Sequence, residues 1–298
     1  MKTFQKSEIN ESVISLSKGN QLKFCKDDIW YKKDLFGYEA AAELAVTDLL
    51  RQSNLTNIKF AEYDIEQITI TGPKMSDDTA IYCESKNFLE AGDRIITAAE
   101  ILKRAGYHNL NKAFEGKSVK GKIEFLVNTV EEATGIKNFG QYLTTLFELD
   151  MFVYNEDRHL NNIAFIEKEN GDYEFCPIFD NGASFMSDTR AFKMKEPVNY
   201  VRTWVEAKPF TTKFNVQVNM ARLLYGQQLE FSKDVKLAES TRNKIREFYG
   251  DDILFRIEDT IEWSKERHPE LVSCMTFQRN DYEDTDLDKA MDLDIEKE

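Results

Sequence analysis

The sequence predicts an α+β fold in which a β-rich N-terminal lobe is followed by a helical C-terminal lobe. Before Ala91, several short segments alternate apolar and polar side chains with the period of two that is typical of β-strands. After Ala91, apolar residues recur at helical spacing, and one hairpin-like stretch carries a dense set of polar residues. We therefore expect an N-terminal lobe over residues 1–92, a C-terminal lobe over 93–280 and an acidic, flexible tail over 281–298.

The composition is typical of a soluble globular protein, with 42% hydrophobic and 31% charged residues. No run approaches the ~18 apolar residues of a membrane span, and the N-terminus lacks a signal-peptide core, so we expect a cytoplasmic protein without a membrane partner. A net charge of -14 argues against direct binding of nucleic acid. The cysteines are widely spaced, which indicates reduced thiols rather than a zinc site or disulfide framework; they are Cys25, Cys83, Cys176 and Cys274.

Residues 12–33 predict a β meander. On its last strand, the period of two places Lys32 and Lys33 on opposite faces, so only one of them can point into the interior. Periodicity alone does not decide between them, because apolar side chains accompany both. The strands of the meander cover residues 12–17, 21–26 and 29–33.

Residues 37–51 predict a helix, because Ala, Leu and Glu dominate and apolar residues recur at helical spacing. Alanines surround Glu43 on this helix, which favours a carboxylate held in packed surroundings. Glu39, one turn earlier, is the rival for such a position, and an exposed helix glutamate is the ordinary alternative.

Strands over residues 57–71 and 80–83 would complete the N-terminal lobe. The residues that follow, 83–88, are expected to connect the two lobes, and they include Glu84. The C-terminal lobe is expected to be mostly helical. Its predicted helices cover residues 94–104, 122–134, 141–154, 232–249 and 251–268.

The stretch from Asp150 to Gly182 predicts a function. Two short β runs joined by an Asn-Gly turn indicate a hairpin, which would bring Asp157 and Asn162 on one side close to Asp180 on the other. Phosphoryl transfer requires a carboxylate that accepts a hydroxyl proton, and Asp and Asn oxygens that hold Mg²⁺. The five-residue spacing from Asp157 to Asn162 equals that in the catalytic loop of protein kinases. The alternative is a polar surface hairpin.

Phosphoryl transfer would also assign roles to the N-terminal lobe. A strand lysine reaches the nucleotide phosphates and a helix glutamate pairs with it, and Lys32 or Lys33 with Glu43 would fill these roles. Glu84, in the expected connection, would lie beside adenine. The polar turn between the first two strands of the meander would cover the phosphates. It lacks a G-x-G-x-x-G pattern, and a plain hairpin turn is an equal alternative. The candidate phosphate-binding residues in this turn are Ser17, Gly19, Asn20 and Gln21.

The motif N-E-D-R-H-L-N-N, followed by C-P-I-F-D-N-G, resembles the HipA-like family of bacterial serine/threonine protein kinases. In particular, it is similar to the compact branch without the extra N-terminal subdomain. The resemblance implies a two-lobed protein-kinase-like fold, ATP and Mg²⁺ as cofactors, and a HipB-like antitoxin as a partner. It makes Asp157 the catalytic aspartate, Asn162 a metal ligand and Asp180 the principal Mg²⁺ ligand. The similar pattern W-Y-K, then G-Y-E-x-x-A-E, favours Lys32 and Glu43.

We therefore predict an ATP- and Mg-dependent kinase that transfers the γ-phosphoryl group to Ser or Thr of a protein substrate and also phosphorylates itself. Lipid kinases of the phosphatidylinositol type share a similar D-R-H-x-x-N loop, so an enzyme acting on a lipid or small-molecule hydroxyl is the first alternative. A catalytically inactive pseudokinase that acts as a binding module is the second. Export of the protein as an effector is an alternative to a cytoplasmic location.

Overall fold

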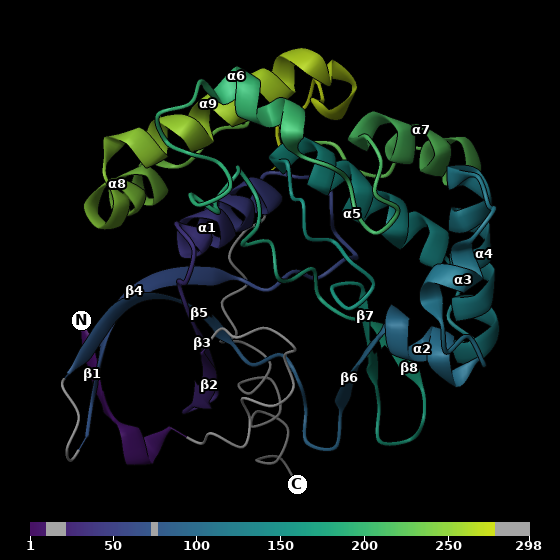
Figure 1. The fold of residues 1–298 in the computed structure, drawn as a ribbon, viewed down its shortest axis with the longest axis horizontal. Coiled ribbons are helices and arrows are strands. Elements are labelled where there is room, and N and C mark those ends of the chain that lie inside the picture. The colour runs from purple at the N-terminus through teal and green to yellow at the C-terminus, as the bar shows by residue number, and fades with distance from the viewer. Residues whose placement is uncertain (10–21, 73–76, 278–298) are drawn as a thin grey trace, which may run out of the picture.

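The computed structural model describes residues 1–9, 22–72 and 77–277. Within these residues the chain forms two lobes, each containing its own sheet (Figure 1). No helix in the described part of the chain is long and apolar enough to cross a membrane. Several predicted features lie outside the described residues: the strand over 12–17, the candidate loop residues Ser17, Gly19, Asn20 and Gln21, and the tail over 281–298.

The N-terminal lobe contains a five-stranded sheet with the strand order β1-β4-β5-β3-β2. Figure 1 shows that this sheet curls strongly. β1 pairs with β4 in parallel, whereas the other neighbouring strands are antiparallel. The elements of this lobe are β1 (Lys2–Gln5), the 3-10 helix η1 (Lys6–Glu8), β2 (Lys23–Lys26), β3 (Ile29–Lys33), α1 (Glu39–Arg51), β4 (Tyr63–Thr71) and β5 (Asp78–Lys86).

Two cores cover the faces of this sheet. On one face the rings of Phe24 and Tyr31 stack with their centroids 5.1 Å apart, and Phe4 of β1 meets both rings edge-on. On the other face α1 packs against β4 and β5. Side chains on all sides of α1 are buried, because its run of alanines lets the sheet and the C-terminal helices approach closely.

The C-terminal lobe surrounds helix α5, in which every residue except Gln141 is buried. Helices α4, α7 and α9 pack against α5, and a second sheet has the strand order β6-β7-β8. The elements of this lobe are β6 (Arg94–Thr97), α2 (Ala98–Arg104), α3 (Leu110–Phe114), α4 (Val119–Thr134), α5 (Phe139–Val153), β7 (Ala164–Glu167), β8 (Tyr173–Phe175), α6 (Val198–Val201), η3 (Arg202–Trp204), α7 (Phe214–Tyr225), α8 (Glu239–Tyr249), α9 (Asp251–Arg267) and η4 (Pro269–Leu271).

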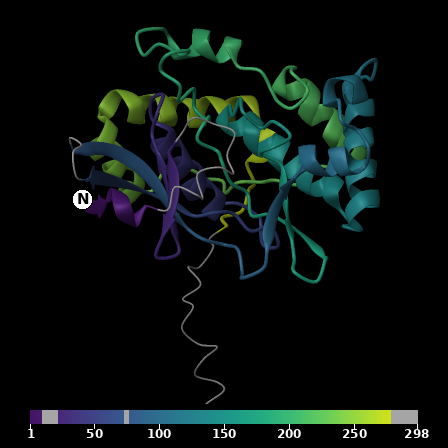
Figure 2. The same cartoon turned by 60° about the horizontal axis from the view of Figure 1, so that its bottom comes forward.

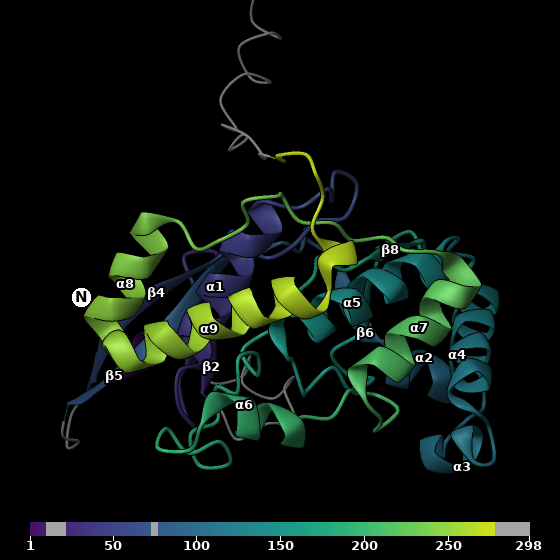
Figure 3. The ribbon, with the colours of Figure 1, turned by 90° about the horizontal axis from the view of Figure 1, so that it is seen from above.

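The last two helices join the lobes. Figure 3 shows α8 beside α1 and α9 running from α8 towards α5, and α8 and α9 contact these helices. The hydroxyl of Tyr249 on α8 donates to Asp34 Oδ2 at 2.5 Å. Asn54 and Glu230 exchange two hydrogen bonds of 2.9 Å. The C-terminal segment therefore holds the N-terminal lobe at several points.

The structure corrects several predicted boundaries. β5 continues to Lys86 instead of ending at Cys83, because it pairs with β3 and β4 along its length. Residues 94–97, predicted as the start of a helix, form β6, because they pair with β7. β4 is shorter than predicted, since residues 57–62 contribute only one isolated bridge, from Phe60 to Ile178. β1, which was not predicted, forms by pairing with the distant β4.

Candidate active site

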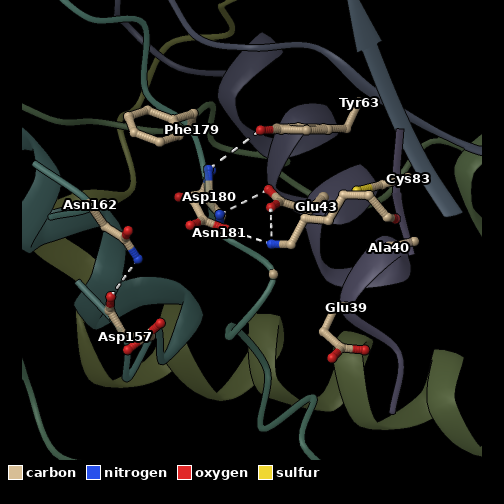
Figure 4. A network of polar contacts seen from close by, with 12 residues as sticks. Glu39, Ala40, Glu43, Tyr63, Cys83, Asp157, Asn162, Phe179, Asp180 and Asn181 are labelled. Atoms are coloured by element: carbon tan, nitrogen blue, oxygen red, sulfur yellow. Dashed lines mark hydrogen bonds and ion pairs between the residues drawn. The ribbon is translucent and has the colours of Figure 1, made fainter. Parts of the chain in front are cut away.

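The described candidate residues other than Glu84 meet between the lobes, where β3 and α1 face the segments on both sides of the β7–β8 hairpin (Figure 4). Figure 4 shows Glu43 of α1 beside Asp180 and Asn181, with Asn162 and Asp157 on the far side of them. β7 and β8 pair antiparallel, which confirms the predicted hairpin. After the roles predicted from the sequence, we call residues 155–162 the catalytic loop and residues 180–182 the metal-site segment.

Lys32 connects the two lobes. Its Nζ lies 2.5 Å from Asp180 Oδ1 and 3.7 Å from Glu43 Oε1. Burial alone would lower the pKa of Lys32, but the carboxylates of Asp180 and Glu43 raise it above its ordinary value. Lys33 points to the opposite face, where it pairs with Asp78 at 2.7 Å. Of the two lysines that periodicity left open, Lys32 is the one inside the cleft.

Glu43 is completely buried on α1. Its Oε2 accepts a hydrogen bond of 2.9 Å from the backbone N–H of Asn181, and its Oε1 has no hydrogen-bond partner among the described residues. Burial raises the pKa of Glu43, and the ammonium of Lys32 opposes this shift. Glu39 has a different position, because its carboxylate accepts hydrogen bonds from the backbone N–H groups of residues 35–37. Glu43, not its rival, therefore faces Lys32.

Arg158 holds the catalytic loop and the metal-site segment together. This fully buried guanidinium forms a bidentate pair with Asp150 of α5, with distances of 3.0 and 3.1 Å. It also donates to the side-chain oxygen of Asn181 at 2.6 Å and to the carbonyl oxygen of Phe179 at 2.9 Å. Because its partners lie on both sides of the hairpin, this one side chain sets the spacing between the two segments.

Asp157 and Asn162 lie at opposite ends of one turn. The Asn162 Nδ2 donates a hydrogen bond of 2.9 Å to the backbone oxygen of Asp157, which orients the amide and leaves its Oδ1 available as a ligand. The side chain of Asp157 is 55% exposed, so it can meet an incoming hydroxyl. Burial raises the pKa of Asp157, whereas His159, whose Nε2 lies 3.8 Å away, opposes this shift.

Asp180 turns its carboxylate towards Lys32 from a left-handed backbone conformation, with φ of 56°. Burial alone would raise its pKa, but the charges of Lys32 and Lys23 and the hydrogen bond from Lys32 hold it below its ordinary value. Gly182 leaves room for this arrangement. A Cβ at position 182 would lie 3.2 Å from the Cβ of Glu39 and 3.4 Å from the Nζ of Lys32. The close packing explains why a glycine ends the D-x-G pattern.

The oxygen atoms of the cluster fit a magnesium-bound nucleotide. Asp180 supplies an ionised carboxylate and Asn162 supplies an amide oxygen, both of them the hard donors that Mg²⁺ prefers. Within residues 1–9, 22–72 and 77–277, no group of three or more His, Cys, Asp or Glu side chains could hold a metal by itself. This donor set agrees with magnesium, which usually takes one or two carboxylates and completes its shell with water and phosphate oxygens.

A second lysine, Lys23, belongs to this site and was not recognised from the sequence. It lies on β2 directly opposite Lys32 of β3, so both side chains emerge on the same face. Its charge contributes to the low pKa of Asp180. The sequence contained a signal for it, because a two-residue turn at Asp27 and Asp28 pairs residue 23 with residue 32.

Glu84, expected in the connection between the lobes, lies inside β5. Its backbone is paired with Tyr31 on one side and Asp64 on the other. Its carboxylate forms an ion pair of 2.5 Å with Lys2 of β1, so the side chain points away from the cleft. The connection begins after Lys86, and a contact of Glu84 with adenine stays a prediction.

The segment after Gly182 is held against the start of α1. The Tyr38 hydroxyl donates to the carbonyl oxygen of Phe185 at 2.6 Å, and the N–H of Thr189 donates to the carbonyl oxygen of Phe36 at 3.1 Å. The chain then runs over the outside of the molecule through α6 towards α7, in green at the top of Figure 2. These contacts couple the metal-site segment to the helix that carries the ion-pair glutamate.

The lobes, the sheet topology and the cluster between them define a two-lobed kinase-like fold. Among solved structures, the chain is similar to the crystal structure of a Helicobacter pylori proinflammatory kinase, CtkA, with a TM-score of 0.52 and 15% sequence identity. The similarity covers 89% of this chain and 93% of that chain. At this identity the comparison shows the fold. No family model and no curated protein matches the sequence.

Proposed function

We propose that this chain is an ATP- and Mg-dependent protein kinase that transfers the γ-phosphoryl group to a serine or threonine hydroxyl and also phosphorylates itself. The observation that carries the proposal is the buried contact of Lys32 with both Glu43 and Asp180, beside an exposed Asp157. The kinase-like fold supports it. The HipA-like form of the catalytic loop and the metal-site segment supports it as well.

Each residue of the cluster has one task in this reaction. Bound ATP and Mg²⁺ supply the phosphoryl group and the cation that neutralises its charge. Lys32, held by Glu43, donates hydrogen bonds to phosphate oxygens. Asp180 and Asn162 hold the cation. Asp157 orients the acceptor hydroxyl and accepts its proton as that oxygen attacks the γ-phosphorus. The bond from the γ-phosphorus to the oxygen of the β-phosphate breaks, and ADP leaves with that electron pair.

A protein acceptor is favoured over a membrane lipid. The net charge of -14 disfavours approach to an anionic bilayer, where phosphoinositides are found. The Asp157 side chain is also exposed, so a hydroxyl on an extended peptide can reach it.

The test is incubation of the purified protein with γ-labelled ATP and Mg²⁺, alone and with a generic basic protein. We expect label on serine or threonine, and we expect the rate to fall about 10²- to 10⁴-fold in Asp157→Ala, which lacks the proton acceptor. Asp252→Ala is the matched control, since this exposed aspartate lies on α9, outside the cluster. Undiminished labelling in Asp157→Ala would reject the proposal, as would labelling of phosphoinositide vesicles without labelling of any protein.

A further inference from the structure

The C-terminal lobe contains a cavity of about 700 Å³ between α3, the start of α4 and the loop over residues 208–211. Lys112, Lys117 and Lys122 line this cavity, which we call the lysine pocket. Glu115 is the one carboxylate among its described lining residues. The pocket is therefore positively charged, although the chain as a whole has 53 acidic and 39 basic residues.

The three lysines have no carboxylate partner within the described ranges. Lys117 instead lies over the ring of Phe125, 5.2 Å from its centroid, and Lys122 lies over the ring of Phe210 at 6.0 Å. Lys120, between them in the sequence, does pair with a carboxylate, Glu124, at 3.8 Å. Three ammonium groups around one pocket outnumber its single carboxylate, Glu115, and an anion in the pocket would balance the excess positive charge.

Packed aromatic side chains support the pocket. The ring of Phe114 meets Phe125 edge-on at 5.4 Å and Phe210 edge-on at 5.5 Å. The loop that forms the other wall is held in place, because Gln217 Nε2 donates to the carbonyl oxygen of Lys208 at 2.7 Å. The lysines are thus arranged around a base of packed aromatic rings.

The loop over residues 208–211 leads into a contact beside the catalytic loop, because the ring of Phe214, at the start of α7, meets the ring of Tyr154 edge-on at 5.6 Å. Burial and the charges of Asp157 and Asp188 raise the pKa of Glu156 to about 7, and the ammonium of Lys208 opposes this shift. The charge of Lys208 therefore acts on Glu156, the neighbour of the proposed proton acceptor. The next residues along the loop, 209–211, line the lysine pocket. One wall of the pocket therefore belongs to a segment that continues to the start of the catalytic loop.

We propose that the lysine pocket binds an acidic segment of the protein substrate and so selects substrates with Asp or Glu near the acceptor residue. The inference rests on the proposed kinase function. A cavity of about 700 Å³ is large enough for a few side chains. Three lysines without a carboxylate partner complement the charge of an acidic segment. Their positive charge would attract acidic segments to the pocket and disfavour the binding of basic ones.

The experiment measures fluorescence anisotropy of a labelled peptide with one serine and a run of glutamates, and of the same peptide with glutamines. The variant is the triple change Lys112→Gln, Lys117→Gln and Lys122→Gln. Because exposed charge pairs each contribute ~0.2–1 kcal/mol, we expect it to bind the glutamate peptide about tenfold more weakly. The control variant replaces Lys59, Lys137 and Lys236 by Gln, which gives the same change in charge at exposed lysines outside the pocket. It should bind the glutamate peptide as tightly as the unmodified protein does.

The inference would be overturned if both triple variants lost the same affinity for the glutamate peptide, or if the unmodified protein bound both peptides equally well. It would also be overturned if phosphoinositide vesicles bound the pocket more tightly than the peptide and displaced it. If the pocket triple does not fold, Glu115→Gln still decides, because removal of the one lining carboxylate should tighten glutamate-peptide binding severalfold. Binding is measured without ATP and repeated in Asp157→Ala. Peptide binding should persist in Asp157→Ala, because Asp157 does not line the pocket. If the unmodified protein binds the peptide but shows no kinase activity, the proposed function alone is rejected.

Discussion

Replacement of Lys32 by Met tests the central cluster, because it removes the cation and keeps an unbranched side chain. The Nζ of Lys32 lies 2.5 Å from Asp180 and 3.7 Å from the completely buried Glu43. Removal of one partner from a buried ion pair costs about 3–5 kcal/mol, since the other charge is left uncompensated. Two carboxylates lose their partner here, and we expect the free energy of unfolding at pH 7 to fall by about 4 kcal/mol.

The loss should depend on pH. Without Lys32, burial and mutual repulsion raise the pKa values of Asp180 and Glu43 in the folded variant above those of the unfolded chain. A carboxyl group with a raised folded pKa destabilises the fold as pH rises from its unfolded pKa, ~4, to its folded pKa. The variant should therefore regain part of its stability between pH 7 and pH 5. Urea unfolding followed by tryptophan fluorescence at both pH values measures this change.

Lys33→Met is the matched control on the same strand. Lys33 pairs with Asp78, whose side chain is 44% exposed, and such a pair contributes only ~0–1 kcal/mol. The double variant Lys32→Met with Glu43→Gln should recover about 1–2 kcal/mol, because one uncompensated carboxylate becomes neutral. Equal losses for the two lysine variants, or a Lys32→Met loss that is the same at pH 5 and pH 7, would refute the reasoning.

Three further predictions concern neighbouring positions. Gly182→Ala should cost about 1–3 kcal/mol in urea unfolding and lower the initial rate, because its Cβ would lie 3.2 Å from the Cβ of Glu39 and 3.4 Å from the Nζ of Lys32. Tyr249→Phe removes the hydrogen-bond donor to Asp34, whose pKa burial raises to about 7. The free energy of unfolding in urea should fall by ~1 kcal/mol. The loss should be larger at pH 8 than at pH 6, because a carboxyl group with a raised pKa destabilises the fold as pH rises. Lys23→Met should weaken ATP binding about tenfold in titration calorimetry, while Lys26→Met, on the other face of β2, should leave it unchanged.

Local patterns predicted the elements that carry the cluster. The period of two put Lys32 and Lys33 on opposite faces, and the strand β3 shows this alternation. The alanine-rich run predicted helix α1, and the hairpin signal predicted that Asp157 and Asp180 would lie on two neighbouring segments. These predictions were possible because each depends on residues that are close in the sequence.

Predictions failed where distant pairing decides the structure. Residues 94–97 were assigned to the helix that follows them, although Ile95, Ile96 and Thr97 are β-branched, and they form β6 because β7 offers a paired edge. β5 extends through Glu84 because β3 and β4 flank it on both sides, and only this extension turns the Glu84 carboxylate towards Lys2. Lys23 was missed for a related reason, since its role follows from the partner strand and not from its own neighbours.

Contacts between α1 and the segment after Gly182 indicate how the cluster is held in place without phosphorylation. Tyr38 at the start of α1 donates to the carbonyl oxygen of Phe185, and the Arg190 guanidinium lies 3.2 Å from the ring centroid of Phe36. Because neutral hydrogen bonds and a cation–π contact tie this segment to α1, no added phosphate is needed to order it. Phosphatase-treated protein should keep its initial rate of phosphoryl transfer. A tenfold drop that rephosphorylation of the segment around Thr189 reverses would contradict this reasoning.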